Sequence, residues 1–121
     1  MIVETLKKQN NMKKFILTYH APQEVMARMA NATPEQKAAG MKPWMDWKDF
    51  MGDKIVDFGS PVMGGTIVNS DGQTEVCTKE ISGYSIIAAD DLNHVQSLLA
   101  NHPYLTKNDG STIGVHEYAP M

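Results

Sequence analysis

The sequence is poor in the features that mark secreted and membrane-spanning proteins. Cys77 is its only cysteine, so no disulfide can form within the chain, and this usage suits a reducing compartment. No apolar run approaches the ~20 residues that a membrane-spanning helix needs. Residues 1–11 are polar and hold no apolar signal-peptide core followed by a small-residue cleavage site. We therefore expect a cytoplasmic protein with a polar N-terminal extension over residues 1–11.

The sequence also has no large excess of positive or negative charge. The formal net charge is -3, the sequence pI is about 5.7, and the basic residues are scattered along the chain. This balance gives no reason to expect nucleic acid or an anionic membrane as a partner. The 121 residues are 42% hydrophobic and 21% charged, which is enough for one globular domain with a modest core. We place that single domain at residues 12–121.

Motifs for phosphate and for metal ions are missing as well. Gly64-Gly65-Thr66 is too short for a phosphate loop and lacks a Walker lysine, so it is better interpreted as a bend or bulge. The four histidines have no close spacing, and the chain offers one cysteine beside them. The sequence therefore predicts no metal site and no cofactor. Cys77 has no His or Asp at motif spacing, which argues against a nucleophile.

Residue patterns predict four main strands, a hairpin and three helical segments. We expect strands at 13–20, 54–59, 82–89 and 112–118, a hairpin over 66–79 that turns at Ser70-Asp71-Gly72, and helices at 23–31, 34–52 and 91–101. Thr33 is the predicted N-cap of the long helix, with Gln36 completing a capping box. Pro43 either kinks that helix or divides it. Asp90 is the predicted cap of the last helix.

Helical spacing also predicts which faces are buried. On the long helix the expected sheet-facing residues are Met41, Trp44, Met45, Lys48 and Met51. On the last helix the expected apolar face is Leu92, Val95, Leu98 and Leu99. Strand alternation places Phe15, Leu17 and Tyr19 under the helices, opposite Ile16, Thr18 and His20. In the last strand, His116 and Tyr118 fall on that opposite face.

The order of elements predicts a ferredoxin-like α+β fold. Two βαβ units joined by a hairpin build a four-stranded antiparallel sheet with the helices on one face. The other face is then left bare. A second copy of the chain is the simplest cover, so we expect a homodimer.

Four segments carry a resemblance to a known family. They are MKKFILTYH, Gly59-Ser60-Pro61, SGYSIIAADDLNHVQSLLANHPYL and the segment from Gly110 to Glu117. Over roughly Met12 to Met121 the chain resembles the DGPF-type branch of the YCII-related family. That resemblance implies a ferredoxin-like fold that pairs into a dimeric α+β barrel. The family is largely without assigned function, and related dimeric barrels include small monooxygenases, muconolactone isomerases and a dehydrochlorinase.

The chain departs from the family's pattern at three places. At the hairpin it has Ser70-Asp71-Gly72-Gln73 in place of the DGPF tetrapeptide. A better-studied branch of the family has a His–Asp pair. Lys42 stands near the expected His, and His102-Pro103 stands at the Asp-Pro step. Neither partner is therefore present in its usual form.

Two histidines are the candidate catalytic residues. His102 could act as a general acid or base at a cleft, because an unperturbed His titrates near neutrality. The alternative is a His at a helix C-terminus that favours the helix dipole. His20 ends a strand, where site residues often lie. His116 shares its sheet face, but strand geometry puts the two rings on the order of 13 Å apart along the sheet. His94 is expected to face solvent.

Four further residues are candidates for ligand binding, together with His116. Trp44 and Trp47, three apart on a helix, could wall a pocket for a planar ligand, with Asp46 as its polar group. Alternatively, Trp44 belongs to the core and Trp47 is half-buried at a dimer edge. Tyr84 could donate a hydrogen bond to a ligand, although buried tyrosines usually find a protein partner.

Three functions remain open from the sequence. The first is binding of a small aromatic or carboxylate metabolite in a cleft between helices and sheet. The second is a cofactor-free isomerase or dehydrohalogenase with His102 or His20 as its base. The third is a structural or interaction domain. The missing His–Asp pair favours the first or the third.

Overall fold

The computed structural model describes residues 12–77, 81–107 and 109–120, so the predicted extension over residues 1–11 lies outside the described residues. Its centre is a four-stranded antiparallel sheet of β1 (Lys13–His20), β2 (Ile55–Pro61), β5 (Gly83–Ala89) and β6 (Thr112–Glu117). The strands are ordered β2-β5-β1-β6, with β1 and β5 in the middle. This is the ferredoxin-like order, and it confirms the predicted fold class.

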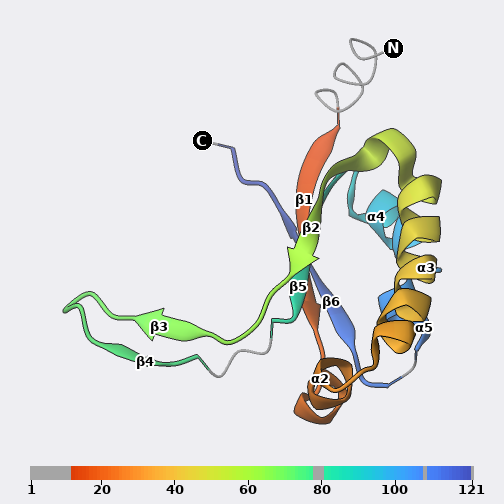
Figure 1. Ribbon diagram of the computed structural model, residues 1–121. Helices are drawn as coiled ribbons and strands as arrows, with labels where there is room; N and C mark the ends of the chain where they lie inside the picture. Colours follow the sequence, from red (N-terminus) through yellow and green to blue (C-terminus); the bar gives the residue numbers. More distant parts are fainter. Residues whose placement is uncertain (1–11, 78–80, 108, 121) are drawn as a thin grey trace.

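The helices lie on one side of this sheet (Figure 1). They are α2 (Gln23–Ala30), α3 (Pro34–Met51), α4 (Leu92–Leu99) and the short α5 (Pro103–Thr106), with a 3-10 turn η1 at Gly52–Lys54. Thr33 caps α3 in the predicted capping box with Gln36. The helix runs on through Pro43, so the divided alternative is wrong. Among the described residues, no helix has the length and apolar character needed to cross a membrane.

Strand alternation places the core correctly. Phe15, Leu17 and Tyr19 of β1 are buried under the helices, with exposed fractions of 2%, 0% and 4%. Leu17 stands opposite Ser85 of β5 and Val115 of β6, so the same layer continues across the sheet. Apolar burial of this kind is the main favourable term in folding.

The predicted inner face of α3 is partly wrong. Trp47 and Met51 are buried, whereas Met41 and Met45 are 47% and 42% exposed. The indole Nε1 of Trp47 donates to the carbonyl oxygen of Leu98 at 3.2 Å. That contact turns the Trp47 side of α3 toward α4. Spacing alone could not choose between two overlapping apolar rows, because both repeat at helical intervals.

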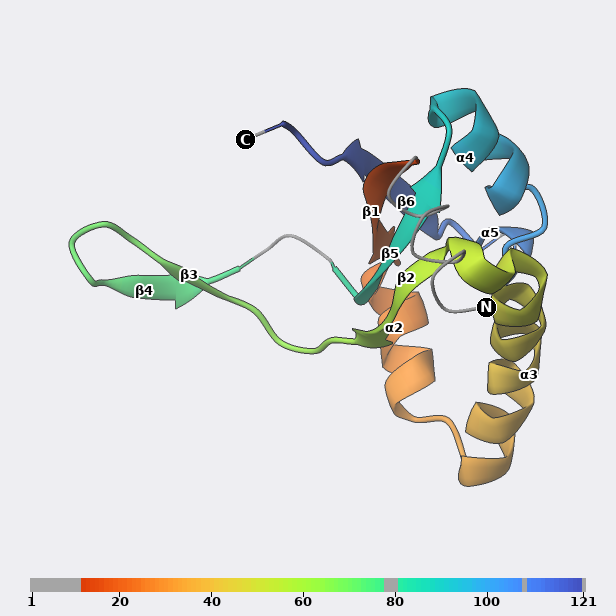
Figure 2. The ribbon, with the colours of Figure 1, turned by 90° about the horizontal axis from the view of Figure 1, so that it is seen from above.

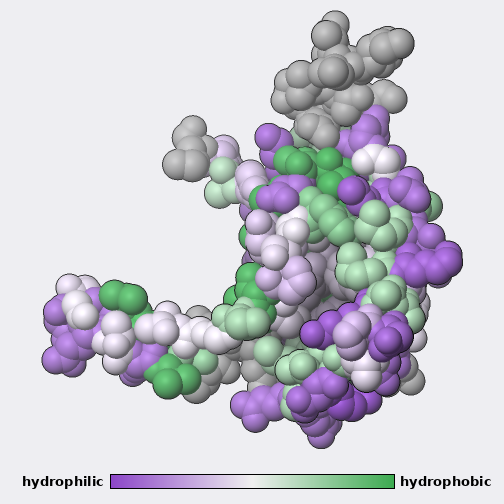
Figure 3. Space-filling view, viewed as in Figure 1, coloured by the Kyte–Doolittle hydropathy of each residue, from purple (hydrophilic) through white to green (hydrophobic). Residues whose placement is uncertain are grey.

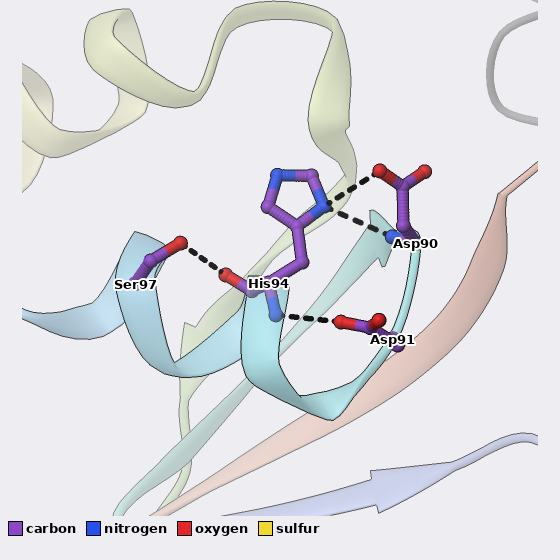
Figure 4. Close-up of polar contacts among 4 residues, drawn as sticks. All are labelled: Asp90, Asp91, His94 and Ser97. Carbon is purple, nitrogen blue, oxygen red and sulfur yellow. Dashed lines mark hydrogen bonds and ion pairs between the residues drawn. The ribbon is translucent and has the colours of Figure 1, made fainter.

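The cap of α4 is Asp91 rather than the predicted Asp90. Its Oδ1 accepts the N–H of His94 at 2.8 Å, while the Asp90 N–H donates to His94 Nδ1 at 2.9 Å (Figure 4). An ion pair between that Nδ1 and Asp90 Oδ2, 3.5 Å apart, requires a protonated ring. It therefore competes with the backbone bond. His94 is half-buried and serves this helix start, and Leu92 is 52% exposed because it sits in the first turn.

The predicted hairpin forms a separate two-stranded sheet. Strands β3 (Thr66–Val68) and β4 (Thr74–Val76) project away from the body on the side opposite the helices (Figures 1 and 2). Val68 and Val76 are 70% and 79% exposed. An isolated hairpin of two strands is marginally stable in water. This arm therefore presents apolar surface that the described part of the chain leaves uncovered.

Candidate functional site

A cavity of about 170 Å³ lies between the sheet and helices α2, α3 and α5. Its walls are mainly aromatic and sulfur-bearing side chains: Tyr19, Met29, Met41, Trp44, Phe58 and Tyr104. We call these residues the aromatic pocket. Figure 3 shows the surface of the molecule from the side on which β2 and α3 border this pocket.

The aromatic rings of the pocket hold one another in edge-to-face contacts. The Tyr19 and Trp44 ring centroids are 5.1 Å apart at 83°, and Trp44 meets Phe58 at 6.2 Å and 74°. Tyr19 and Tyr104 lie 5.2 Å apart. Such pairs contribute roughly 0.5–1.5 kcal/mol each beyond their area burial. The walls of the pocket are therefore preorganised.

Strands β2 and β5 approach each other closely beside the pocket. Gly59 of β2 has φ +83°, and a Cβ placed there would overlap the backbone carbonyl oxygen of Tyr84. A side chain at this position is excluded both by its backbone conformation and by the close approach. Glycine therefore lets β2 and β5 meet beside the pocket.

A buried hydrogen-bond chain lies behind Tyr19, outside the lining of the pocket. The Tyr19 hydroxyl donates to Ser85 Oγ at 2.7 Å, and Ser85 Oγ donates to the Phe58 carbonyl oxygen at 2.6 Å. Each hydroxyl has one proton, so these donors are committed. The remaining contact, 3.4 Å between Tyr19 and His102 Nε2, must then be donated by the histidine.

His102 is consequently a neutral imidazole with hydrogen on Nε2. Its Nδ1 accepts the N–H of Tyr104 at 3.0 Å and so caps α5. The ring is fully buried, with the Trp44 and Trp47 centroids 4.7 Å and 4.4 Å away. Burial lowers the pKa of His102 to about 3, and the positive charge of Lys107 adds to that effect.

Tyr19, the tyrosine of this hydrogen-bond chain, is also kept neutral. Burial raises the pKa of Tyr19 to about 12, against a smaller opposing effect of its hydrogen bond to Ser85. The hydrogen-bonded groups Tyr19, Ser85 and His102 therefore carry no charge near neutral pH. Their polar atoms bond to partners inside the protein.

These contacts correct one of the two interpretations of His102. It is not a charged histidine at the C-terminus of α4, since it is buried, neutral and caps the following helix. Its use as a base stays a prediction. In this geometry both ring nitrogens are engaged by Tyr104 and Tyr19, so no lone pair faces the pocket.

Lys107 brings the only charge to the lining of the aromatic pocket, within the residues that the structure describes. Its Nζ lies 5.6 Å from the Tyr104 ring centroid, a cation–π distance that holds the ammonium group against the pocket wall. The arrangement thus combines a planar, apolar interior with a single positive group.

The two tryptophans match neither predicted arrangement in full. Trp44 is half-buried and lines the pocket, whereas Trp47 is 4% exposed and belongs to the core. Asp46 lies on the exposed side of α3 with Lys42 3.4 Å away, outside the pocket lining. Tyr84 lines the pocket, and its hydroxyl is 3.4 Å from Asp57 Oδ2.

His20 and His116 lie on the open face of the sheet, away from the aromatic pocket. A Cβ placed on Gly114 would be 3.4 Å from His20 Nε2 and 3.6 Å from His116 Nε2. The two nitrogens are therefore separated by no more than the sum of these distances, about 7 Å. The prediction of about 13 Å was wrong because it counted strand rise alone, and both side chains lean over the glycine.

Sequence reasoning missed several members of the aromatic pocket. Phe58 lies on β2, whereas Tyr104 lies on α5 and Lys107 is the C-cap residue of that short helix. Ser85 had a usable signal, since it is the one hydroxyl on the buried side of β5. A buried hydroxyl needs a partner, and a tyrosine on the adjacent strand is a plausible donor.

Comparisons with known proteins identify no family for this chain. No family model matches the sequence, and no curated protein matches it. The resemblance to the YCII-related family therefore stays a prediction. A solved structure similar to this chain is 5-chloro-2-hydroxyhydroquinone dehydrochlorinase from Burkholderia phenoliruptrix AC1100, in complex with 2,5-dihydroxybenzoquinone. The two are 18% identical with a TM-score of 0.47, over 85% of this chain and 91% of that one. The strand order and register of this chain establish its fold independently of that likeness.

Proposed function

We propose that the protein binds a small aromatic carboxylate in the aromatic pocket. The observation that carries this proposal is the pairing of aromatic walls with one charged group, Lys107, at the lining. Flat apolar walls favour a planar ring by stacking and by burial of its faces. The ammonium group favours a negative substituent on that ring.

The size of the cavity sets the size of the ligand. Its 170 Å³ is close to the ~150 Å³ engineered cavity that holds one benzene molecule. It is below the ~300–1,000 Å³ that is typical for drug-sized ligands. A single substituted ring fits this volume, whereas a nucleotide or a fused polycyclic cofactor does not.

The buried polar chain supports binding rather than catalysis. The Tyr19 and Ser85 hydroxyls and both His102 nitrogens have partners inside the protein. A group whose lone pairs are occupied must break a bond before it can take a proton. Among the described residues, His102 is therefore not a ready base for the predicted isomerase or dehydrohalogenase, which we retain as the alternative.

We also propose a cytoplasmic homodimer. The sheet face opposite the helices and the projecting hairpin β3–β4 are the surfaces that a second copy would cover. Val68 and Val76 add apolar area there. Light scattering after size exclusion tests this assembly, and a monomer at micromolar concentration contradicts it.

A thermal-shift screen tests the binding proposal. The panel holds substituted benzoates, benzamide, phenols, catechols and lactones. A ligand of the folded state raises the melting temperature by mass action. We expect benzoates to raise it in the wild type and to lose the effect in Trp44→Ala. A matched control is Lys42→Met, which removes an exposed lysine outside the pocket.

The pattern of shifts separates the three functions. Shifts with benzoates that disappear in Trp44→Ala support the proposal. Slow conversion of a bound compound, followed by absorbance or mass spectrometry, favours the enzyme. No shift with any compound contradicts the binding proposal and favours a structural or interaction domain.

A further inference from the structure

A second site lies on the sheet face opposite the aromatic pocket. It is built on two adjacent strands, with Thr18 and His20 on β1 and Gly114 and His116 on β6. In the antiparallel register, Thr18 stands opposite Gly114. His20 and His116 flank that pair, His20 opposite Thr112 and His116 opposite Ile16. All of these side chains fall on the same face, because strand residues two apart share a face.

Gly114 makes room for the convergence. A Cβ placed there would lie 2.5 Å from Thr18 Oγ1, besides its short distances to both imidazoles. The backbone of Gly114 is not in the left-handed region, so its conformation does not require glycine. What the position requires is the absence of a side chain. Three polar groups occupy the space that a side chain would otherwise fill.

The atoms that converge are ligands for a transition-metal ion. A neutral imidazole nitrogen binds copper, nickel and zinc ions at roughly 2.0–2.1 Å, as found for zinc. Two such nitrogens on one ion lie no more than about 4 Å apart. The present separation is no more than about 7 Å, so both side chains must rotate toward each other over Gly114 for their nitrogens to reach one ion.

We propose that His20 and His116 form a binding site for one divalent ion of the copper, nickel or zinc type. Within the described residues, no group of three or more His, Cys, Asp or Glu side chains is placed to hold a metal. The proposed site accordingly draws two imidazole ligands from the chain and no third ligand of these types. Its remaining positions are open to water or to groups of a second chain that faces the sheet. Thr18 Oγ1, now 2.8 Å from His20 Nε2, gives up that contact when the ion enters.

Titration of the full chain with nickel and zinc salts tests the site. The titration uses protein without an affinity tag, because the histidines of a tag would bind the same ions. Calorimetry is expected to show one ion per chain, or one per two chains if two sites meet. His20→Ala and His116→Ala are each expected to weaken binding at least tenfold. His94→Ala, a histidine on another element, is the matched control and should leave affinity unchanged.

Copper provides a direct readout of the ligands. The electron paramagnetic resonance spectrum of the protein with one Cu²⁺ is expected to show coupling to two imidazole nitrogens. One coupling should be lost in each single variant. Equal affinity and an unchanged spectrum in both His20→Ala and His116→Ala overturn the proposal, as does the absence of saturable binding.

Filling the space over Gly114 is a second test that keeps both histidines. Thr18→Ala removes the hydroxyl that now contacts His20, and we expect it to retain the metal. Adding Gly114→Ala in that background avoids the clash with the hydroxyl but places a methyl group between the imidazoles. Circular dichroism checks that the sheet is intact. Affinity is then expected to fall tenfold, and unchanged affinity in the folded double variant overturns the proposal.

Discussion

The buried imidazole of His102 makes the free energy of unfolding decrease as the pH falls. The fold depresses the pKa of His102 from 6.5 to about 3, chiefly by burial. The neutral ring is therefore favoured by the fold. Stability is complete above the unfolded pKa and is lost as pH falls from 6.5 toward about 3. Because each pH unit below 6.5 costs about 1.4 kcal/mol, the loss near pH 4.5 is about 2.7 kcal/mol.

His102→Asn isolates this contribution. The Asn carbonyl oxygen can still accept the N–H of Tyr104 and cap α5, but the side chain cannot titrate. It loses the ring packing between Trp44 and Trp47 and the contact with Tyr19. We expect the variant to be less stable than the wild type by about 2–3 kcal/mol at neutral pH. Near pH 4.5 that difference should have almost vanished.

Urea unfolding followed by tryptophan fluorescence measures both proteins from about pH 7.5 to about pH 4.5. Ionic strength is held constant. Carboxylates titrate in both proteins and cancel in the difference between them. Parallel stability curves over this range refute the reasoning, because they mean that His102 is protonated without cost or was never shielded from water.

Three further changes test the packing around the pocket. Ser85→Ala removes the acceptor of the buried Tyr19 hydroxyl and should cost about 1–3 kcal/mol in urea unfolding; a neutral effect would mean that water replaces the serine. Gly59→Ala forces a Cβ onto the Tyr84 carbonyl at φ +83° and should cost at least about 2 kcal/mol, seen as a lower melting temperature; an unchanged melt contradicts the close approach of β2 and β5. Thr33→Ala removes the N-cap of α3 and should cost about 1 kcal/mol by thermal unfolding, and a stabilised variant contradicts the capping box.

The sheet could be predicted from the sequence because its signals are local and periodic. Lys13–His20 is rich in β-branched and aromatic residues, and its alternation places Tyr19 inward and His20 outward, as observed. Topology rules then leave few ways to connect four such strands with crossover helices. Thr33 and Gln36 likewise predict the start of α3, because together they form a capping box.

The pocket could not be predicted because it depends on which side of α3 turns inward. Trp44 and Trp47 both fit a helical stripe, and the choice is made by the Trp47 bond to Leu98 on α4. His102 shows the same limit. Its position after a helix indicated either a base at a cleft or a histidine at a helix C-terminus, whereas tertiary packing between two indoles buries the ring completely.

The sequence prediction underestimated how far side chains can reach across the sheet. Strand rise separates the backbone positions of His20 and His116, but a missing side chain at Gly114 lets both rings lean together. A glycine within a strand, flanked by polar residues two positions away across the register, is the signal that could have revealed this.

Calorimetric titration with benzoate and benzamide is the most direct test of the central claim. The two ligands have the same ring and differ in charge, so Lys107 should distinguish them. In the wild type we expect benzoate to bind about fivefold more tightly, for an exposed charge pair of about 1 kcal/mol. In Lys107→Met that preference should disappear while benzamide affinity is kept. Equal binding of both ligands by the wild type, or a benzoate preference that survives in Lys107→Met, contradicts the assignment of this pocket to aromatic carboxylates.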